Sequence, residues 1–461
     1  MRFAERRIVG TEPGGGAAAR PSRWDPLTLA LGGVLLQYVW RVQEVLPVLR
    51  YVQFTAVVSA AAILLFVVQG HPRRRLTTLR HPLFRPVIAI TVLAVLSVPT
   101  SLRVGGSFDF LTGNFLKTVA LAGLLASSVR DRADVERLLR VFVIGGAGYV
   151  LAAVAFAGSG SGRLGGKGSY DPNDLGLFTV CTIPMCIYLM RRAAPMRDRI
   201  SGAVSTVVLL AGTVQSGSRG GFLALIALSL YALLGLGAVR RSKRITVAVV
   251  TFSVIAGVAS DSYWDRMRTI LRPEEDYNWA GMAESGRIEL WKRGLGYMAE
   301  RPLSGVGVNQ FDVAEGTLSP QALARQESGL GFRWSAAHSS YVQVGAELGV
   351  FGLLAYVALL IMSYREARRV ARAAAVPADR LLAQAFGGTV TAYVVGGAFL
   401  SQAYSTYLYF AIGLLIGFSR VVTRARAAAA AGVSAPSAPP RGAGGGAGVP
   451  AGSTRRRGGA W

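Results

Sequence analysis

Long apolar runs separated by short polar links dominate the chain. A helix needs about 20 apolar residues to cross a bilayer, and about twelve windows of this kind can be drawn. They are residues 27–46, 50–69, 84–102, 109–129, 141–158, 174–190, 200–217, 220–239, 245–260, 338–363, 382–402 and 404–422. Arg41 with Glu44 interrupts the first window, and Lys117 interrupts the fourth. The pattern predicts an all-α polytopic membrane protein with about twelve transmembrane helices.

One polar stretch, residues 261–337, is far longer than the other links and predicts a single large loop between the ninth and tenth helices. The expected organisation therefore has five parts, which are residues 1–26, 27–260, 261–337, 338–423 and 424–461. The first and last parts are tails rich in glycine, alanine and arginine, which cannot bury a core, so we expect them to be disordered. The long polar lead of the first tail is not that of a cleaved signal peptide.

The composition, 52% hydrophobic with a mean hydropathy of +0.40, agrees with one polytopic domain. A net charge of +25 would favour a nucleic-acid partner in a soluble protein, but here the two tails and five links hold 34 Lys and Arg against 9 Asp and Glu, and the rest holds 16 of each. These segments are residues 1–26, 70–85, 130–140, 191–199, 240–244, 364–380 and 420–461. The positive-inside rule places them, and both termini, in the cytoplasm. We expect a protein of the inner (plasma) membrane with an extracytoplasmic 261–337 loop. The basic cytoplasmic links are expected to contact anionic lipids, and no nucleic-acid partner is expected.

Two outward links carry candidate phosphate-binding cations. Residues 161–175 place Arg163 and Lys167 among glycines, followed by a turn in which Asn173 or Asp174 is able to cap the next helix. The alternative is an ordinary turn with incidental cations. Arg219 lies in the glycine-rich link 215–221, where it can either reach lipid phosphate or hold a diphosphate through its planar fork of donors.

A helix is predicted in the large loop, from a cap at Ser285 to a break at Pro302. Its expected apolar stripe is formed by Ile288, Trp291, Leu295 and Met298. Arg287 lies in the first turn and off this stripe, so it is either part of a solvated face or available to a ligand.

His338 is the histidine that lies outside the cytoplasmic links, in which His71 and His81 are expected to be solvated. It stands at the outer start of a span, where the helix dipole disfavours the charged imidazolium and favours a neutral ring that accepts a proton. Three glycines behind it would let neighbouring helices approach, namely Gly345, Gly349 and Gly352.

Glu347 follows in the same span, at a depth of about 14 Å. A carboxylate inside a membrane is a functional candidate with a partner to be found. Lys117, the other ionisable group placed well inside a span, is the expected partner. The alternative is that Glu347 binds the end of an adjacent helix by hydrogen bonds.

Four motifs recur in the same order in the O-antigen ligase and polymerase superfamily, which this chain resembles. They are Ser218-Arg-Gly-Gly221, Arg287 followed by Trp291, Pro302-Leu-Ser-Gly-Val-Gly307, and His338 followed by Glu347-Leu-Gly349. Arg163 with Asp171-Pro-Asn173 is similar to the preceding outer loop of that family. The resemblance covers roughly residues 50–420 and implies the GT-C-like architecture of multi-span, lipid-carrier-dependent glycosyltransferases. Many members have His-Asn where this chain has His338-Ser339.

The resemblance implies a membrane glycosyltransferase that acts on the outer face without a metal or another cofactor. Its donor would be a glycan on undecaprenyl diphosphate, and its acceptor a hydroxyl of a glycan, glycolipid or protein. Such a reaction needs a base and cations for the departing diphosphate. His338 would be the base, while Arg219 and Arg287, with Arg163, would bind the diphosphate. The other substrate-binding candidates are Lys167, Asn173, Glu347 and Lys117.

A transporter of a small anion or a glycan intermediate is the alternative from another class. An ion-coupled carrier usually needs several ionisable groups near the bilayer midplane, and this chain offers Glu347 and Lys117. The sequence contains no Asp-x-Asp pair, which argues against the metal-dependent lipid-linked glycosyltransferases. Ligase and polymerase stay open, because both use the same donor chemistry.

Overall fold

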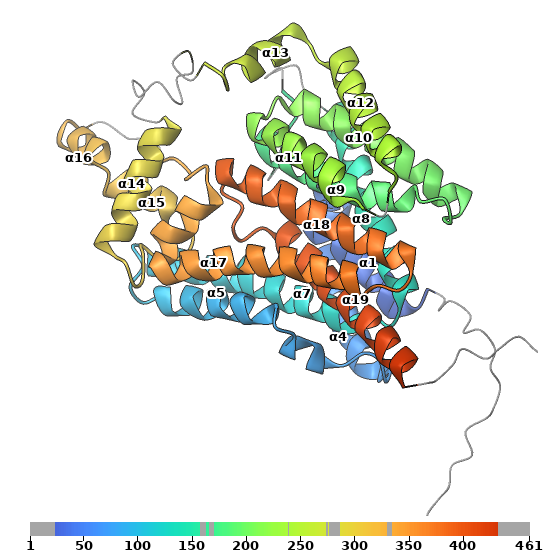
Figure 1. Cartoon of the computed structure of the whole chain (residues 1–461). Helices are drawn as coiled ribbons and strands as arrows, with labels where there is room; N and C mark the ends of the chain where they lie inside the picture. The colour runs from blue at the N-terminus through green and yellow to red at the C-terminus, as the bar shows by residue number, and fades with distance from the viewer. Residues whose placement is uncertain are drawn as a thin grey trace, which may run out of the picture. The chain divides into compact units, whose positions relative to one another are not determined.

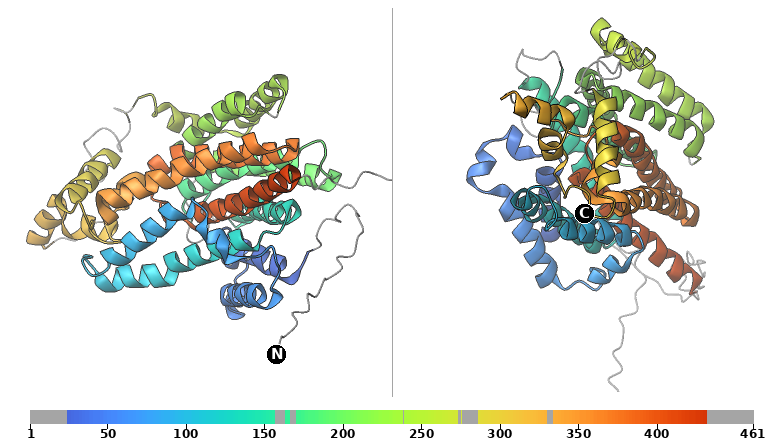
Figure 2. Two further views of the ribbon diagram at one scale, coloured as in Figure 1. Left: turned by 60° about the horizontal axis from the view of Figure 1, so that its bottom comes forward. Right: turned by 90° about the vertical axis from the view of Figure 1, so that its left-hand side faces the viewer.

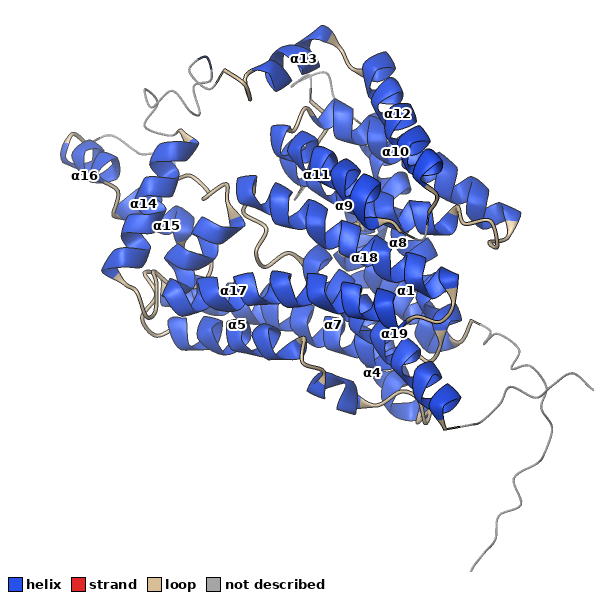
Figure 3. Ribbon diagram, in the orientation of Figure 1, coloured by secondary structure: helices blue, strands red, loops and turns tan. Residues whose placement is uncertain are grey.

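The structure is a computed structural model that describes residues 24–156, 163–165, 170–237, 239–272, 275, 286–329 and 334–431. Throughout this part of the chain, the secondary structure is helical and no strand occurs (Figure 3). Residues Ser22–Ala427 form one compact unit, to which the description below refers. The all-α prediction is confirmed for the described residues.

A helix covers most of each of the twelve apolar windows. These helices are α1 (Pro26–Tyr38), α4 (Phe54–Gln69), α5 (Phe84–Ser97), α7 (Leu116–Ser128), α8 (Arg132–Ala155), α9 (Pro172–Leu189), α10 (Met196–Ser216), α11 (Arg219–Gly235), α12 (Arg241–Val258), α17 (Ser340–Ala373), α18 (Pro377–Gly396) and α19 (Thr406–Ala430). In the fourth window α6 (Val104–Phe110) and a π-helical turn, η2 (Leu111–Phe115), run directly into α7.

Five described spans are long and apolar enough to cross a membrane, or six if the sharply bent pair of α12 and α13 (Asp261–Arg268) counts as one. The five are Val104–Ser128, Arg132–Ala155, Ser340–Ala373, Pro377–Phe399 and Thr406–Ala430. Helices α1, α4, α5 and α11 are apolar but shorter. In α1 the reason is visible, because the helix ends at Tyr38, before Arg41 and Glu44. Several apolar helices of membrane-spanning length identify a multi-pass membrane protein.

The large polar stretch contains several helices of its own. After α13 it contains α14 (Arg287–Glu300), α15 (Phe311–Thr317) and α16 (Pro320–Glu327). The last three gather at the N-terminal end of α17 in every view (Figures 1 and 2). The other short elements are α2 (Val42–Val45), α3 (Val48–Tyr51), η1 (Leu76–Arg80) and η4 (Gly397–Phe399).

Helix α17 lies at the centre of the packing. It contacts α5, α18 and α14, while α18 also packs against α9 and α11 (Figure 1). Helix α19 supplies a nearly continuous buried face, with Tyr407, Phe410 and Phe418 among the largest fully buried side chains. The core therefore lies among α17, α18, α19 and the helices that flank them.

Helix α17 is interrupted at Gly349, which has φ 70° and ψ −167°. The break frees carbonyl groups, and the Pro302–Gly307 motif binds them: Val306 N–H donates to Ala346 O at 2.8 Å, and Gly307 N–H to Glu347 O at 3.1 Å. In return, Val350 N–H donates to Pro302 O at 2.9 Å. A broken helix at membrane depth is tolerated where protein satisfies its backbone in this way. Gly349 was expected only to allow helix approach; its role is to break the helix.

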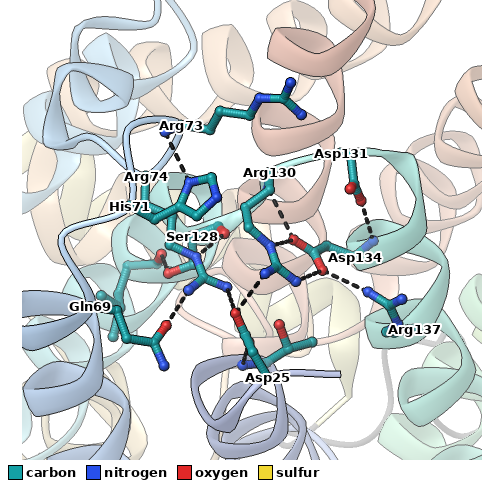
Figure 4. A network of polar contacts seen from close by, with 12 residues as sticks. Asp25, Gln69, His71, Arg73, Arg74, Ser128, Arg130, Asp131, Asp134 and Arg137 are labelled. Carbon is teal, nitrogen blue, oxygen red and sulfur yellow. Dashed lines mark hydrogen bonds and ion pairs between the residues drawn. The ribbon is translucent and has the colours of Figure 1, made fainter. Parts of the chain in front are cut away.

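The links predicted to be cytoplasmic share one side of the unit. Arg74 is buried and forms an ion pair with Asp25 at 2.5 Å, and Arg130 bridges Asp25 at 2.8 Å and Asp134 at 2.7 Å (Figure 4). Although burial opposes the charge, hydrogen bonds from Thr28 and Arg74 lower the pKa of Asp25. These basic links therefore hold helix ends together as well as carrying charge.

Further ion pairs extend this side to the remaining helices. Arg132 lies 3.2 Å from Asp379, and Arg191 lies 2.7 Å from Glu136. The expectation that His81 is solvated is wrong, because its Nε2 lies 3.3 Å from Glu366 and its side chain is only 11% exposed. A buried carboxylate at the end of α17 provides the partner that the local sequence does not reveal.

Candidate active site on the side of the large loop

The predicted outward connections meet on the opposite side of the unit. Tyr170 O–H donates to Val39 O at 2.7 Å, which joins the α8–α9 and α1–α2 connections. Leu102 N–H donates to Val306 O at 3.0 Å, which joins the start of α6 to the large loop. This side contains the described sequence-predicted site residues, with the exception of Glu347, which lies deeper in α17.

Arg163 and Asn173 contact one another. The Arg163 Nη2 donates to Asn173 Oδ1 and its Nε to Ser216 O, both at 2.9 Å. The expected cap at Asn173 or Asp174 is wrong: both residues lie in the first turn of α9, and Asp171 is the N-cap through a reciprocal capping box with Asp174. Arg163 is half-buried, so the α8–α9 connection presents this cation against the turn that precedes α11.

Two further arginines meet at the same turn. Arg219 is the first residue of α11, after the N-cap Ser218, and its Nη1 donates to Thr269 Oγ1 at 3.0 Å. Arg266 comes from α13, and a Cβ atom added at Gly217 would lie 2.7 Å from its Nη1. We call Arg163, Arg219 and Arg266 the arginine cluster. Three guanidinium groups around one turn form a binding surface suited to phosphate oxygens.

Arg287 is the half-buried first residue of α14. One turn later, Trp291 Nε1 donates to Ala337 O at 3.0 Å, next to His338. Residues four apart share a helix face, so Arg287 lies on the face that α14 turns toward His338. Its predicted cap, Ser285, lies outside the described residues.

The predicted apolar stripe of α14 is corrected by the structure. The fully buried face is formed by Leu290, Gly294 and Tyr297, whereas Leu295 is 50% exposed. Gly294 lets α17 and α15 approach, because a Cβ there would lie within 2.8 Å of Val342 and Phe311. The face is selected by this close approach and not by the largest apolar side chains.

An ion pair fixes the helices of the loop to one another. Arg293 of α14 lies 2.6 Å from the fully buried Glu315 of α15, which also accepts a hydrogen bond from Tyr297 O–H at 3.0 Å. Burial opposes the charge of Arg293, but Glu315 raises the pKa of its guanidinium. Burial and Glu315 also raise the pKa of Tyr297. This ion pair holds Arg287 and Trp291 on a defined support.

His338 lies just outside α17, two residues before the first helical residue Ser340. Its φ of 48° is left-handed, and its N–H donates to Ser401 Oγ at 2.8 Å. A non-glycine residue in this region is uncommon, and such conformations concentrate at functional sites. The half-buried histidine is thus held by its backbone rather than as part of the helix.

The α18–α19 connection, residues 397–405, contacts all three predicted catalytic segments. Its Phe399 packs on Gly220, next to Arg219, where an added Cβ would lie 3.1 Å from Phe399 Cβ. The Phe399 ring centroid is 6.3 Å from that of Trp291. Ser401 binds the backbone of His338. Arg219, Arg287 and His338 are therefore arranged around one short segment that none of the sequence motifs contains.

Glu347 and Lys117 are not partners. Glu347 is 1% exposed and accepts hydrogen bonds from Asn309 N–H at 2.9 Å and Phe311 N–H at 3.3 Å, at the start of α15. This agrees with the alternative in which Glu347 binds the end of an adjacent helix. Lys117 is exposed and lines a cavity. Glu347 therefore holds the start of α15 against α17.

The structure leaves one predicted residue undescribed and adds one that was not predicted. Lys167 lies outside the described residues, so its position is not assigned. Arg266 was missed, and the signal available in the sequence was only its place in the last turn of the amphipathic α13. In the part of the chain that the structure describes, no group of three or more His, Cys, Asp or Glu side chains is placed to hold a metal ion.

A comparison with protein families finds a match over residues 204–357 to the family described as O-antigen ligase. Residues 204–357 are therefore similar to O-antigen ligases. The O-antigen ligase region covers about a third of the chain and contains Arg219, Arg287, His338 and Glu347, whereas Lys117, Arg163 and Asn173 precede it. Among curated proteins the comparison finds none that matches.

Proposed function

We propose that the protein is a membrane glycosyltransferase that moves a glycan from undecaprenyl diphosphate to an acceptor hydroxyl on the outer face of the membrane. The O-antigen ligase match supports an enzyme of the ligase or polymerase type. The observation that carries the proposal is the arrangement of Arg219, Arg287 and His338 around the α18–α19 connection. It combines a base and cations from three segments distant in sequence.

In the proposed reaction the acceptor oxygen bonds to the anomeric carbon of the glycan while the bond from that carbon to the phosphate oxygen breaks. The hydroxyl proton moves to the His338 imidazole, and the electron pair leaves with the lipid diphosphate. Arg219 and Arg287, with Arg163, stabilise the charge that develops on the leaving group. We add Arg266 to this set, because it shares the turn that Arg163 and Arg219 contact.

A transporter is less well supported. The carboxylate that a proton-coupled carrier would use, Glu347, is engaged by backbone N–H groups that hold the large loop. Transport also provides no explanation for the left-handed backbone of His338 near Arg219 and Arg287, the first residues of α11 and α14.

The test is transfer by purified protein in liposomes, with undecaprenyl-diphosphate glycan and acceptors from the host and EDTA present. We expect His338→Ala to lower the transfer rate by about 10²–10⁴-fold, the usual contribution of general acid–base catalysis. Arg325→Gln on the exposed face of α16 is the matched control and should keep wild-type activity. Full activity in both His338→Ala and Arg219→Ala would contradict the site, and product length separates a polymerase from a ligase.

A further inference from the structure

A polar cavity of about 610 Å³ lies on the other side of the α18–α19 connection from the arginine cluster. Its wall is formed by the end of α1, the η2–α7 segment, α17 and residues 401–406. Among the described residues that line it, the Lys, Arg, Asp and Glu side chains are Arg41 and Lys117, and both are cationic. Amides form much of the remaining wall, among them Gln37, Asn114, Asn309, Gln343 and Gln402. Such a lining fits an anionic, hydroxyl-rich ligand.

Buried polar atoms of Gln37 and Arg41 in this wall make no hydrogen bond to the residues that the structure describes. Gln37 is 3% exposed, and its Oε1 is buried without a hydrogen bond. The Nε of Arg41 is likewise buried without one. Buried polar atoms are almost always satisfied, so these two point to a ligand. Lys117 makes no ion pair within the described residues and is exposed at the cavity wall.

The backbone that precedes Lys117 contains a π-helical turn. The π-helical turn η2 interrupts the α6–α7 span and places Gly113 and Asn114 in the wall, with Lys117 one turn later. Such single π turns inside helices occur frequently at functional sites. Arg41 has a left-handed φ of 47° and stacks on Tyr170, with its Cζ 4.7 Å from the ring centroid.

None of the described carboxylates near the cavity lines its wall, so none neutralises the positive charge of Arg41 and Lys117 inside it. Glu44 lies 3.5 Å from Arg41 Nη1 but does not line the cavity. Asp174 accepts a hydrogen bond from Gln402 Nε2 at 2.6 Å, and Glu347 accepts from the backbone of Asn309 at 2.9 Å. Both carboxylates therefore orient wall residues from behind.

The α18–α19 connection separates this cavity from the arginine cluster. Phe399 faces Gly220, beside Arg219, whereas Ser401 and Gln402 line the cavity. Ser401 also accepts the hydrogen bond from His338 N–H. A transferase needs its base between two substrates, and His338 is attached to the segment between two cationic sites.

We propose that this cavity is the acceptor subsite and that Arg41 and Lys117 bind a phosphate group carried by the acceptor glycan. The assignment rests on the proposed function, in which the arginine cluster and Arg287 take the diphosphate of the donor. A second cationic site is then available for an acceptor with its own phosphate. Two sources share this chemistry, a second carrier-linked glycan and a phosphorylated glycolipid.

Binding is tested first, without turnover, by titrating inorganic pyrophosphate into the full-length protein in nanodiscs with EDTA present. The wild type should bind two equivalents, and Arg41→Gln/Lys117→Gln and Arg219→Gln/Arg287→Gln should each bind one. The control Arg50→Gln changes an exposed arginine of α3 that does not line the cavity and should keep both equivalents. A wild type that binds fewer than two, or an Arg41→Gln/Lys117→Gln protein that still binds two, would overturn the proposal.

The transfer assay then separates this subsite from the donor site. Because a hydrogen bond to a charged group typically contributes a tenfold or larger effect, Lys117→Gln should raise the acceptor KM about tenfold and leave the donor KM unchanged. Lys117 is exposed and makes no ion pair with any residue that the structure describes, so this variant should fold normally. Supplying a carrier-linked glycan or a phosphorylated glycolipid as separate acceptors shows which source responds. If Lys117→Gln transfers glycan with an unchanged acceptor KM, the acceptor subsite is contradicted and the proposed function is not. If the wild type transfers no glycan, the proposed function is contradicted, whereas the number of pyrophosphate sites is still measured by the titration.

Discussion

At the scale of single residues, tertiary contacts distinguish arginines that have similar neighbours in the sequence. Arg266 and Arg268 are two residues apart in α13 and are both exposed. Arg266 lies against Gly217 in the arginine cluster, whereas Arg268 lies 3.0 Å from the exposed Asp265. The turn before α11 therefore distinguishes two side chains that look equivalent in the sequence.

This difference gives a matched pair of variants. Arg266→Gln should lower kcat/KM for the carrier-linked donor by about 10- to 100-fold, because it removes one charge-assisted contact to a diphosphate. Arg268→Gln should have little effect, since exposed ion pairs contribute little. Initial transfer rates over a range of donor concentrations check both. Equal losses in the two variants would show that general charge, and not the cluster, matters.

The side of the unit on which the predicted site residues lie could be inferred from the sequence, whereas their contacts could not. Arg163, Arg219 and His338 lie next to apolar runs and Arg287 lies in the large loop, so the alternation of spans already predicts that they share a side. The contact of Arg163 with Asn173 and the contacts of Glu347 with α15 depend on tertiary approach, which a single sequence does not encode locally. Arg41 was treated as an interruption for the same reason.

At the scale of elements, the broken α17 connects the span to the large loop. Gly349 has a backbone conformation open to glycine almost alone, and an added Cβ would lie 2.3 Å from Pro302 O. The Pro302–Gly307 motif binds the carbonyl groups that the break frees. These two motifs, separated by about forty residues in the chain, are therefore one structural unit that supports α14 and α15.

We expect Gly349→Ala to lower the free energy of unfolding by more than about 1–3 kcal/mol, the cost of the backbone conformation alone, because the methyl group also meets Pro302. Gly296→Ala in α14 is the control. An added Cβ there meets nothing within 4 Å, so a gain of about 0.5–1 kcal/mol is expected from helix propensity. Thermal unfolding of the purified proteins in detergent measures both. An unchanged melting temperature for Gly349→Ala would contradict the interpretation of the break.

Helix positions could be predicted, but helix ends and buried faces could not. Each of the twelve windows contains a helix, because long apolar runs have few alternatives in a membrane. Five described spans are long enough to cross a membrane. Helix α1 is shorter than its apolar window, because it ends at Tyr38 and the charged residues Arg41 and Glu44 lie beyond its end. The buried face of α14 was misassigned because Gly294 carries no hydrophobic signal.

At the scale of the whole molecule, the two sides of the Ser22–Ala427 unit differ in what their charges do. On the side of the basic links, arginines such as Arg74 and Arg130 are engaged by carboxylates between helix ends. On the side of the large loop, the arginine cluster gathers three cations near one turn, and Arg41 and Lys117 line a cavity. The first set stabilises the bundle, and the second is suited to binding anions.

The orientation of these two sides can be measured with single cysteines, because the native Cys181 and Cys186 are both fully buried. Leu271→Cys marks the large loop, where the residue is 86% exposed, and Arg197→Cys marks the side of the basic links, where the side chain is 80% exposed. We expect a membrane-impermeant maleimide to label Leu271→Cys in intact spheroplasts and Arg197→Cys only after permeabilisation, with the wild type unlabelled, because short basic links stay in the cytoplasm. The reverse pattern would place His338 and the arginine cluster on the cytoplasmic side and remove the basis for transfer on the outer face.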